Sequence, residues 1–260
     1  RERYSLRPLH NFFFTRDAAM SVLDDVLVGR MANDVRERES FIMEAIFDYY
    51  PAFDTSTFNA GSSETACEKI SIEGGDVLIG REDLLLIGIG ACTNPEGVDV
   101  VIDRLKERPG KKHIVVQELP TNRESFIHLD MVFTFLSRSE CLVYEPVVMQ
   151  PNRFKTIHIS IDGREVKIEE KKNILETLSH IGLELKPIYC GGTADPWVQE
   201  REQWHSGANF FAIAPGKVIG YSRNLNTINE LHKNGYEVIP AKEVISGKID
   251  LSGHSKYVVT

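Results

Sequence analysis

The sequence lacks the features that mark secreted, membrane-spanning and nucleic-acid-binding proteins. Its 260 residues contain four cysteines, and no two of them form a Cys-x-x-Cys pair. This argues against a disulfide framework or a zinc ribbon and fits a reducing compartment. No apolar run is long enough to cross a bilayer. The formal net charge is -8 without any block of Lys or Arg, so we expect neither nucleic acid nor a membrane as partner.

The sequence also lacks a starting methionine and a signal-peptide pattern, since its first residue is Arg1. We therefore expect the chain to start partway through a longer protein. Its composition, 42% hydrophobic and 26% charged, is that of an ordinary globular protein. The length is ample for one sizeable core or two small ones.

One order of elements recurs along the chain: two strands joined by a polar turn, an amphipathic helix and a closing strand. The four hairpins are predicted over residues 11–31, 70–90, 126–148 and 208–224. The four helices are predicted over residues 36–50, 95–108, 171–182 and 226–235. Closing strands are predicted at 113–119, 183–190 and 236–241, and a polar hairpin precedes the third helix. The repeat favours an α+β fold, a ring of similar modules around a channel, over a doubly wound sheet.

Polar residues fall at comparable points of the four modules. They are Thr15-Arg16-Asp17, Glu73-Gly74-Gly75-Asp76, His128-Leu129-Asp130 and Gly207-Ala208-Asn209. In the segment SFIHLDMVFTFL, His128 and Asp130 are two positions apart, and such positions on a strand share one face. A polar pair on a sheet edge is the alternative. In a ring the strand ends meet, so we expect one acidic funnel lined by these side chains.

Carboxylates buried together repel one another and are tolerated where a cation binds. A hard metal ion is one such cation, but the chain lacks a calcium-loop pattern. A guanidinium is the other, because its planar fork of donors pairs with opposed carboxylates. His128, beside such a pair, is placed for general acid/base work. The Gly74-Gly75 pair either lets the backbone approach a ligand closely or makes a tight bend.

Taken together, these segments resemble bacterial arginine deiminases almost end to end. The motifs are FTRD at 14–17, EGGD at 73–76, HLD at 128–130, REQW and GAN within 201–209, and NELHKNGYEVIPA at 229–241. The resemblance implies the pentein fold, an α/β propeller of ββαβ modules, as a single catalytic domain over residues 1–260. Four modules are visible where the family has five, so we expect the domain to be incomplete at both ends.

The resemblance also implies a chemistry. In that family a cysteine thiolate attacks the guanidinium carbon of L-arginine, ammonia leaves, and water releases L-citrulline. By motif, Asp17 and Asp130 would grip the guanidinium, and His128 and Glu73 would transfer protons. The implied substrate-binding residues are Asn11, Phe14, Arg36 and Asp76. We expect no cofactor and no metal, a small guanidine as substrate and a cytoplasmic location, and we leave a homo-oligomer open.

The sequence departs from the family at the nucleophile. The family places its cysteine in a glycine-rich loop near the C-terminus, where this chain reads ISGKIDLSGHSKYVVT. A gapless register would put Ser255 on that cysteine. Because KYVVT has strand composition, we expect instead a strand ending at Thr260 and the cysteine loop beyond it. None of the cysteines in the chain fits the nucleophile: Cys67, Cys92, Cys141 and Cys190.

These departures keep other functions open. Cys92, in GIGACTNPEG, stands at a family arginine that binds the substrate carboxylate, so another guanidino-group hydrolase fits. Such hydrolases include an arginine dihydrolase and enzymes acting on agmatine or methylarginine. A non-catalytic arginine-binding protein fits the Ser255 register. We expect the 260-residue chain alone to be inactive, because it shows no suitable thiolate.

Overall fold

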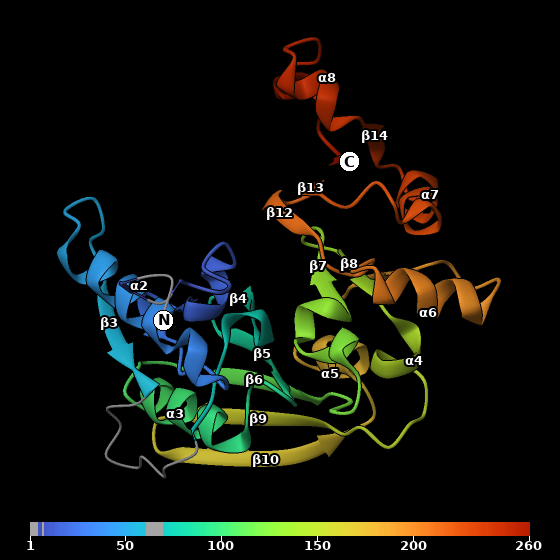
Figure 1. Cartoon of the computed structure of the whole chain (residues 1–260). Coiled ribbons are helices and arrows are strands. Elements are labelled where there is room, and N and C mark those ends of the chain that lie inside the picture. The colour runs from blue at the N-terminus through green and yellow to red at the C-terminus, as the bar shows by residue number, and fades with distance from the viewer. Residues whose placement is uncertain (1–4, 7, 61–69) are drawn as a thin grey trace. The chain divides into compact units, whose positions relative to one another are not determined.

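The computed structural model describes residues 5, 6, 8–60 and 70–260 and is drawn in Figure 1. Its contacts divide the chain into two compact units. Unit 1 is Arg1–Glu118 with Ile157–Glu169, and unit 2 is Leu119–Thr156 with Glu170–Thr260. The expectation of a single domain over residues 1–260 stays a prediction.

The first sheet of unit 1 has the strand order β1-β2-β3. Strands β1 (Ala19–Val22) and β2 (Asp25–Val28) form an antiparallel hairpin, and β3 (Ser56–Asn59) pairs parallel to β2 after helix α2 (Glu37–Tyr49). The hairpin is shorter than predicted, because residues 11–18 are not extended. The Phe14 N–H donates to the Asn11 carbonyl at 2.8 Å, which closes a turn, and helix α1 (Thr15–Ala18) follows.

The second sheet of unit 1 has the order β10-β9-β6-β5-β4. Strands β4 (Val77–Arg81) and β5 (Leu84–Ile89) are antiparallel, and β6 (Lys112–Glu118) runs parallel to β5 after helix α3 (Pro95–Lys106). The predicted helix start at Pro95 is confirmed. The Asn94 side chain caps it by accepting from the Gly97 N–H at 3.0 Å. The predicted polar hairpin forms β9 (Thr156–Asp162) and β10 (Glu165–Lys171).

Helix α3 closes the core of unit 1 over the second sheet. Val98, Val101 and Leu105, spaced three and four residues apart, are buried in one cluster with Leu85 and Ile87 of β5. Each fully buried side chain of this size contributes about 1.5–3 kcal/mol. The amphipathic helix pattern over 95–108 is thereby explained by packing, and the core fixes the strands of the second sheet.

The third sheet, in unit 2, has the order β11-β8-β7. Strands β7 (Phe133–Phe135) and β8 (Glu140–Val143) are antiparallel, and β11 (Lys186–Tyr189) pairs parallel to β8. Helices α4 (Glu145–Val148) and α5 (Ile174–His180) lie between β8 and β11 in the chain. Helix α6 (Pro196–Trp204) then leads to the fourth sheet.

The fourth sheet has the order β12-β13-β15-β14. Its elements are β12 (Phe211–Ala214), β13 (Lys217–Ile219), α7 (Leu225–Lys233), β14 (Glu237–Ile239), α8 (Ala241–Ile245) and β15 (Tyr257–Val259). The predicted strand ahead of Thr260 is confirmed. It lies between β13 and β14 and pairs parallel with both. All three of its residues are buried, as expected for a central parallel strand.

The strand orders confirm a mixed α+β chain of several sheets. In the first three sheets an antiparallel hairpin is followed by a helix and a strand parallel to its second member. The fourth sheet has the extra strand β15 between its hairpin and its closing strand. Among the described residues, no helix combines the length and the apolarity needed to span a membrane. The ring around a channel stays a prediction.

Candidate functional site

The polar residue sets lie in short helical turns directly ahead of the first strands, and not on the strands. Asp17 is in α1, ahead of β1, and a 3-10 helix over Gly74–Asp76 precedes β4. A second 3-10 helix over Leu129–Met131 precedes β7. The set at residues 207–209 likewise precedes β12. The polar sets therefore lie at comparable positions of the modules, but in turns and not in strands.

The expectation that His128 and Asp130 stand side by side on a strand is wrong. The Met131 N–H donates to the His128 carbonyl at 3.2 Å, and the Val132 N–H donates to the Leu129 carbonyl at 3.0 Å. These bonds close a 3-10 turn of about three residues, so residues two positions apart point to different sides. His128 is buried ahead of this turn, and Asp130 is half-buried within it.

The polar turns meet in pairs within each unit. In unit 1, Arg16 donates from Nε to the Gly74 carbonyl at 2.9 Å and from Nη2 to the Val77 carbonyl at 2.7 Å. In unit 2, Asn209 donates from Nδ2 to the Asp130 carbonyl at 3.4 Å. The first set is thus joined to the second, and the third to the fourth.

Gly74 is required by close backbone packing in unit 1. A Cβ atom added at this position would lie 1.8 Å from the Arg16 carbonyl oxygen. The Gly74-Gly75 pair begins a 3-10 turn, and the restriction at Gly74 comes from packing against the Arg16 backbone, which neither reading named; close approach to a ligand stays a prediction. The turn that follows Glu73 is thereby pressed against α1, which carries Asp17.

Replacing Gly74 with alanine is expected to lower the free energy of unfolding by about 3 kcal/mol. The added Cβ would clash with backbone atoms of Arg16, and a change of side-chain rotamer cannot relieve such a clash. Chemical denaturation would measure the loss. Gly253→Ala is the matched control, since an added Cβ there meets nothing within 4 Å, and its change should stay below about 0.5 kcal/mol. Equal effects of the two substitutions would contradict this account of the close approach.

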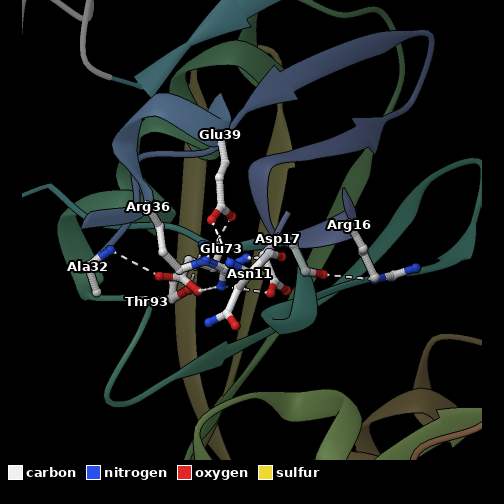
Figure 2. Close-up of polar contacts among 9 residues, drawn as sticks. Asn11, Arg16, Asp17, Ala32, Arg36, Glu39, Glu73 and Thr93 are labelled. Carbon is white, nitrogen blue, oxygen red and sulfur yellow. Dashed lines mark hydrogen bonds and ion pairs between the residues drawn. The ribbon is translucent and has the colours of Figure 1, made fainter. Parts of the chain in front are cut away.

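The Arg36 guanidinium lies among three carboxylates of unit 1 (Figure 2). Its Nε donates to Glu39 Oε2 at 2.9 Å, and its Nη1 donates to Asp17 Oδ2 at 2.9 Å and to Glu73 Oε2 at 3.5 Å. All four side chains are buried. Among the contacts described within unit 1, three carboxylates surround one guanidinium, and such a group of acidic side chains is suited to binding a cation.

The charge of Arg36 is secured by its neighbours. Burial alone would lower the pKa of Arg36, but the bonded carboxylates of Asp17 and Glu39 outweigh it and hold the pKa above its ordinary value.

Glu73 is fixed from two other sides. Its Oε1 accepts from the Ala32 N–H at 3.0 Å, and its own N–H donates to Thr93 Oγ1 at 3.2 Å.

The other predicted substrate-binding residues occupy different positions around this group. Asn11 donates its backbone N–H to Glu39 Oε1 at 2.9 Å, and its carbonyl accepts from Arg36 Nη2 at 3.4 Å. Phe14 is exposed and packs on Phe13 with ring centroids 4.4 Å apart. Asp76 is fully buried and closes the 3-10 turn through its N–H.

Gln203 is a buried residue of unit 2 that the sequence reasoning did not assign. Its Nε2 donates to the Ser125 carbonyl at 2.6 Å and to the Met131 carbonyl at 3.2 Å, on either side of His128 and Asp130. The amide therefore holds the turn that carries both. Its place in the REQW motif is the sequence feature by which Gln203 could have been identified.

Glu202, the residue before Gln203, holds the start of α7. Its Oε1 accepts from the N–H and from Nδ2 of Asn226, at 2.9 and 2.8 Å. Its Oε2 accepts from the N–H and Oγ1 of Thr227, at 2.8 and 2.7 Å. A carboxylate at a helix N-terminus satisfies donors that have no partner inside the helix. The REQW motif thus joins two parts of unit 2.

The described cysteines differ in environment. Cys141 and Cys190 are buried, and burial raises the pKa of both thiols, that of Cys190 to about 12. Neither supplies a thiolate at neutral pH. Cys92 is half-buried, with its sulfur within 4.8 Å of a Glu73 carboxylate oxygen. Cys67 lies outside the described residues, and Ser255 is exposed just ahead of β15.

Comparison with known proteins gives a consistent answer. The family model described as arginine deiminase matches residues 1–248. The chain is 36% identical over 252 residues to an arginine deiminase of Bacillus cereus (strain ATCC 10987 / NRS 248), covering 95% of this chain and 60% of the relative. An arginine deiminase of Borrelia garinii subsp. bavariensis is 34% identical over 255 residues, again with 60% of the relative covered. The chain therefore spans 60% of the length of these relatives.

Solved structures with a similar fold are more distant in sequence. The N-terminal domain of ArgZ, an arginine dihydrolase from Cyanobacteria, superposes with a TM-score of 0.57 at 18% identity, over 86% of this chain and 66% of that one. DDAH from Pseudomonas aeruginosa superposes with a TM-score of 0.52 at 20% identity, over 88% of this chain and 68% of that one. Likeness at this level of identity concerns the fold.

Proposed function

Because the chain belongs to the arginine deiminase family, we propose that it acts in hydrolysis of a guanidinium C–N bond, converting L-arginine and water to L-citrulline and ammonia. The observation that carries this proposal lies in unit 1. The buried carboxylates of Asp17, Glu39 and Glu73 already surround a guanidinium, that of Arg36. Their spacing and charge suit the group that the reaction attacks.

The roles proposed for the residues follow the family motifs. Asp17 and Asp130 each accept N–H bonds from the substrate guanidinium and keep its plane fixed, which orients the carbon for attack. Glu73 and His128 carry protons to the leaving nitrogen and from the attacking water. Asn11, Phe14 and Arg36 contact the amino-acid end of the substrate, and Asp76 supports the turn after Glu73.

The reaction needs a thiolate, as the family resemblance implies. A sulfur–carbon bond forms as the C–N bond breaks, ammonia leaves with a proton, and water then releases the thiolate and L-citrulline. We do not assign this thiolate to Cys141 or Cys190, because burial keeps both thiols protonated.

The finer architecture is part of the same proposal. The ββαβ repeats are taken as blades of one pentein propeller around a channel, in a single catalytic domain acting in the cytoplasm. Support comes from the shared strand order of three sheets and from polar turns that meet in pairs within each unit. The similar solved structures, of an arginine dihydrolase domain and of DDAH, point the same way.

The test is turnover of L-arginine by the full-length protein, with L-citrulline and ammonia measured together. His128→Asn should lower kcat by about 100-fold or more, because proton transfer to the leaving group is lost. The matched control is His180→Asn, an exposed histidine at the end of α5, which should leave kcat unchanged. L-ornithine in place of L-citrulline would indicate a dihydrolase. Unchanged kcat in His128→Asn, or no conversion and no binding of L-arginine by the unaltered protein, would contradict the proposal.

A further inference from the structure

The geometry points to Glu39 as a positioning residue for guanidinium binding, an inference that rests on the proposed function. We infer that Glu39 holds the Arg36 guanidinium by its Nε and so leaves Asp17 and Glu73 able to accept a substrate guanidinium. Glu39 is fully buried, with an exposed fraction of 0%. It lies outside the residues to which the family motifs give a role.

Glu39 is bonded to two of the predicted substrate-binding residues at once. Its Oε2 accepts from Arg36 Nε at 2.9 Å, and its Oε1 accepts from the Asn11 N–H at 2.9 Å (Figure 2). Arg36 Nη2 closes the triangle on the Asn11 carbonyl at 3.4 Å. Since the turn at Asn11–Phe14 leads directly into α1, this triangle also fixes the segment that carries Asp17.

The anchor decides what the rest of the Arg36 guanidinium can contact. With Nε on Glu39, only Nη1 reaches the other carboxylates, Asp17 at 2.9 Å and Glu73 at 3.5 Å. Without the anchor the planar group is free to turn and take two parallel N–H···O bonds from one carboxylate, the geometry that guanidinium groups prefer. Arg36 would then compete with the substrate for the same oxygens.

Charge acts in the same direction. Removing the Glu39 charge leaves two carboxylates to be shared by two guanidinium groups, the protein's own and the substrate's. The group of side chains then carries one negative charge fewer, and a cationic ligand gains less from binding beside it. A neutral amide at this position also has only one oxygen to serve two donors, Arg36 Nε and the Asn11 N–H.

A purely structural role is the competing explanation, because Glu39 lies in the first turn of α2, where a carboxylate favours the helix dipole. Glu37 lies in the same turn and is exposed. Glu37→Gln therefore removes the same charge from the same helix end without touching Arg36 or Asn11, and it is the matched control for Glu39→Gln.

The experiment is calorimetric titration of the protein with L-arginine and with methylguanidine, which lacks the amino-acid end. Glu39→Gln should raise the Kd of both ligands by about tenfold or more, whereas Glu37→Gln should change neither more than about twofold. In parallel, the ¹⁵N-labelled Arg36 Nε–H signal should exchange slowly in the unaltered protein and in Glu37→Gln. It should shift and exchange faster in Glu39→Gln.

The outcomes separate this inference from the proposed function. If the unaltered protein binds L-arginine and Glu39→Gln binds both ligands as tightly as Glu37→Gln does, the positioning role is overturned and the function stands. The same holds if methylguanidine binding alone is unchanged. If the unaltered protein binds neither ligand, both fail. Should Glu39→Gln not fold, Glu39→Asp keeps the charge but is too short to reach both donors, and it is expected to weaken both ligands in the same sense.

Discussion

Replacing Asp17 with alanine in the full-length protein is expected to abolish detectable turnover of L-arginine and to raise its Kd by about 100-fold or more. Asp17 is buried, and its Oδ2 bonds to Arg36 Nη1 at 2.9 Å, so it is already placed to accept from a guanidinium. Truncating one partner of a buried, hydrogen-bonded charge pair costs about 2–5 kcal/mol. The measurements are L-citrulline formation and calorimetric titration with L-arginine.

The controls for Asp17→Ala separate charge from local folding. Asp24→Ala removes an exposed carboxylate from the neighbouring β1–β2 turn and should leave binding unchanged. Asp17→Asn keeps the shape and loses the charge, and it is expected to behave like Asp17→Ala. Near-normal binding in Asp17→Asn would show that the carboxylate does not pair with the substrate, and the assignment of Asp17 would then be withdrawn.

Replacing Glu202 is expected to produce the largest loss of stability in unit 2. Its two oxygens accept four hydrogen bonds from Asn226 and Thr227 at the start of α7, and its exposed fraction is 0%. In Glu202→Ala the two backbone N–H groups and the Thr227 hydroxyl are left without this acceptor. The expected loss is about 3 kcal/mol or more of the free energy of unfolding, measured by chemical denaturation at pH 7.

The same carboxylate makes stability depend on pH. Burial alone would raise the pKa of Glu202, but the bonds from Thr227 and Asn226 outweigh it and hold the pKa below its ordinary value. A lowered folded-state pKa contributes stability that is fully present above the unfolded-state pKa, about 4.3 for a glutamate. That stability is lost as the pH falls from there through the folded-state pKa.

Glu202→Gln should therefore lose less stability than the unaltered protein when the pH is taken from 5 to 3. The control is Glu200→Gln. Glu200 lies in the same helix, and its carboxylate pairs with the exposed Arg123. This variant should lose as much stability between pH 5 and 3 as the unaltered protein does. An acid loss in Glu202→Gln as steep as in the unaltered protein would show that Glu202 does not carry this part of the pH dependence.

Sequence patterns were sufficient where local rules decide the structure. Helix α3 begins at Pro95 behind a capping Asn94, as its composition predicts, because proline and asparagine act on their own turn of the backbone. The hairpins and closing strands follow from apolar alternation between polar turns. The strand ahead of Thr260 follows from an apolar run, since a central strand is buried on both faces.

The same patterns failed where short turns resemble strands. The run around His128 and Asp130 is apolar enough to read as a strand, yet a 3-10 turn forms there, held from outside by Gln203. A bond from a residue more than seventy positions away leaves no mark on local periodicity. The segment at 11–18 fails similarly, because its turn is fixed through Asn11 by Glu39.

The sequence predicts which residues belong to the candidate site better than it predicts the contacts between them. Asp17, Glu73 and Arg36 came from motifs, but the burial of Glu39 could not be read from RERES, a segment that looks like a solvated helix end. Charged residues are buried only when tertiary partners compensate them, and this group draws on three segments of unit 1, around Asp17, Arg36 and Glu73.

The position of β15 has a consequence for the order in which the protein is built. Strands β13 and β14 pair with β15 and not with each other, so the sides of these two strands that face β15 stay unpaired until residues 257–259 are available. During synthesis on the ribosome, the hairpin β12–β13 and helix α7 are made long before that strand emerges. Pairing at such sequence separation is slow, since the loop must close before any contact forms. The fourth sheet can therefore be completed only once residues 257–259 have emerged, and until then the open edges of β13 and β14 expose the nascent chain to aggregation and to chaperones.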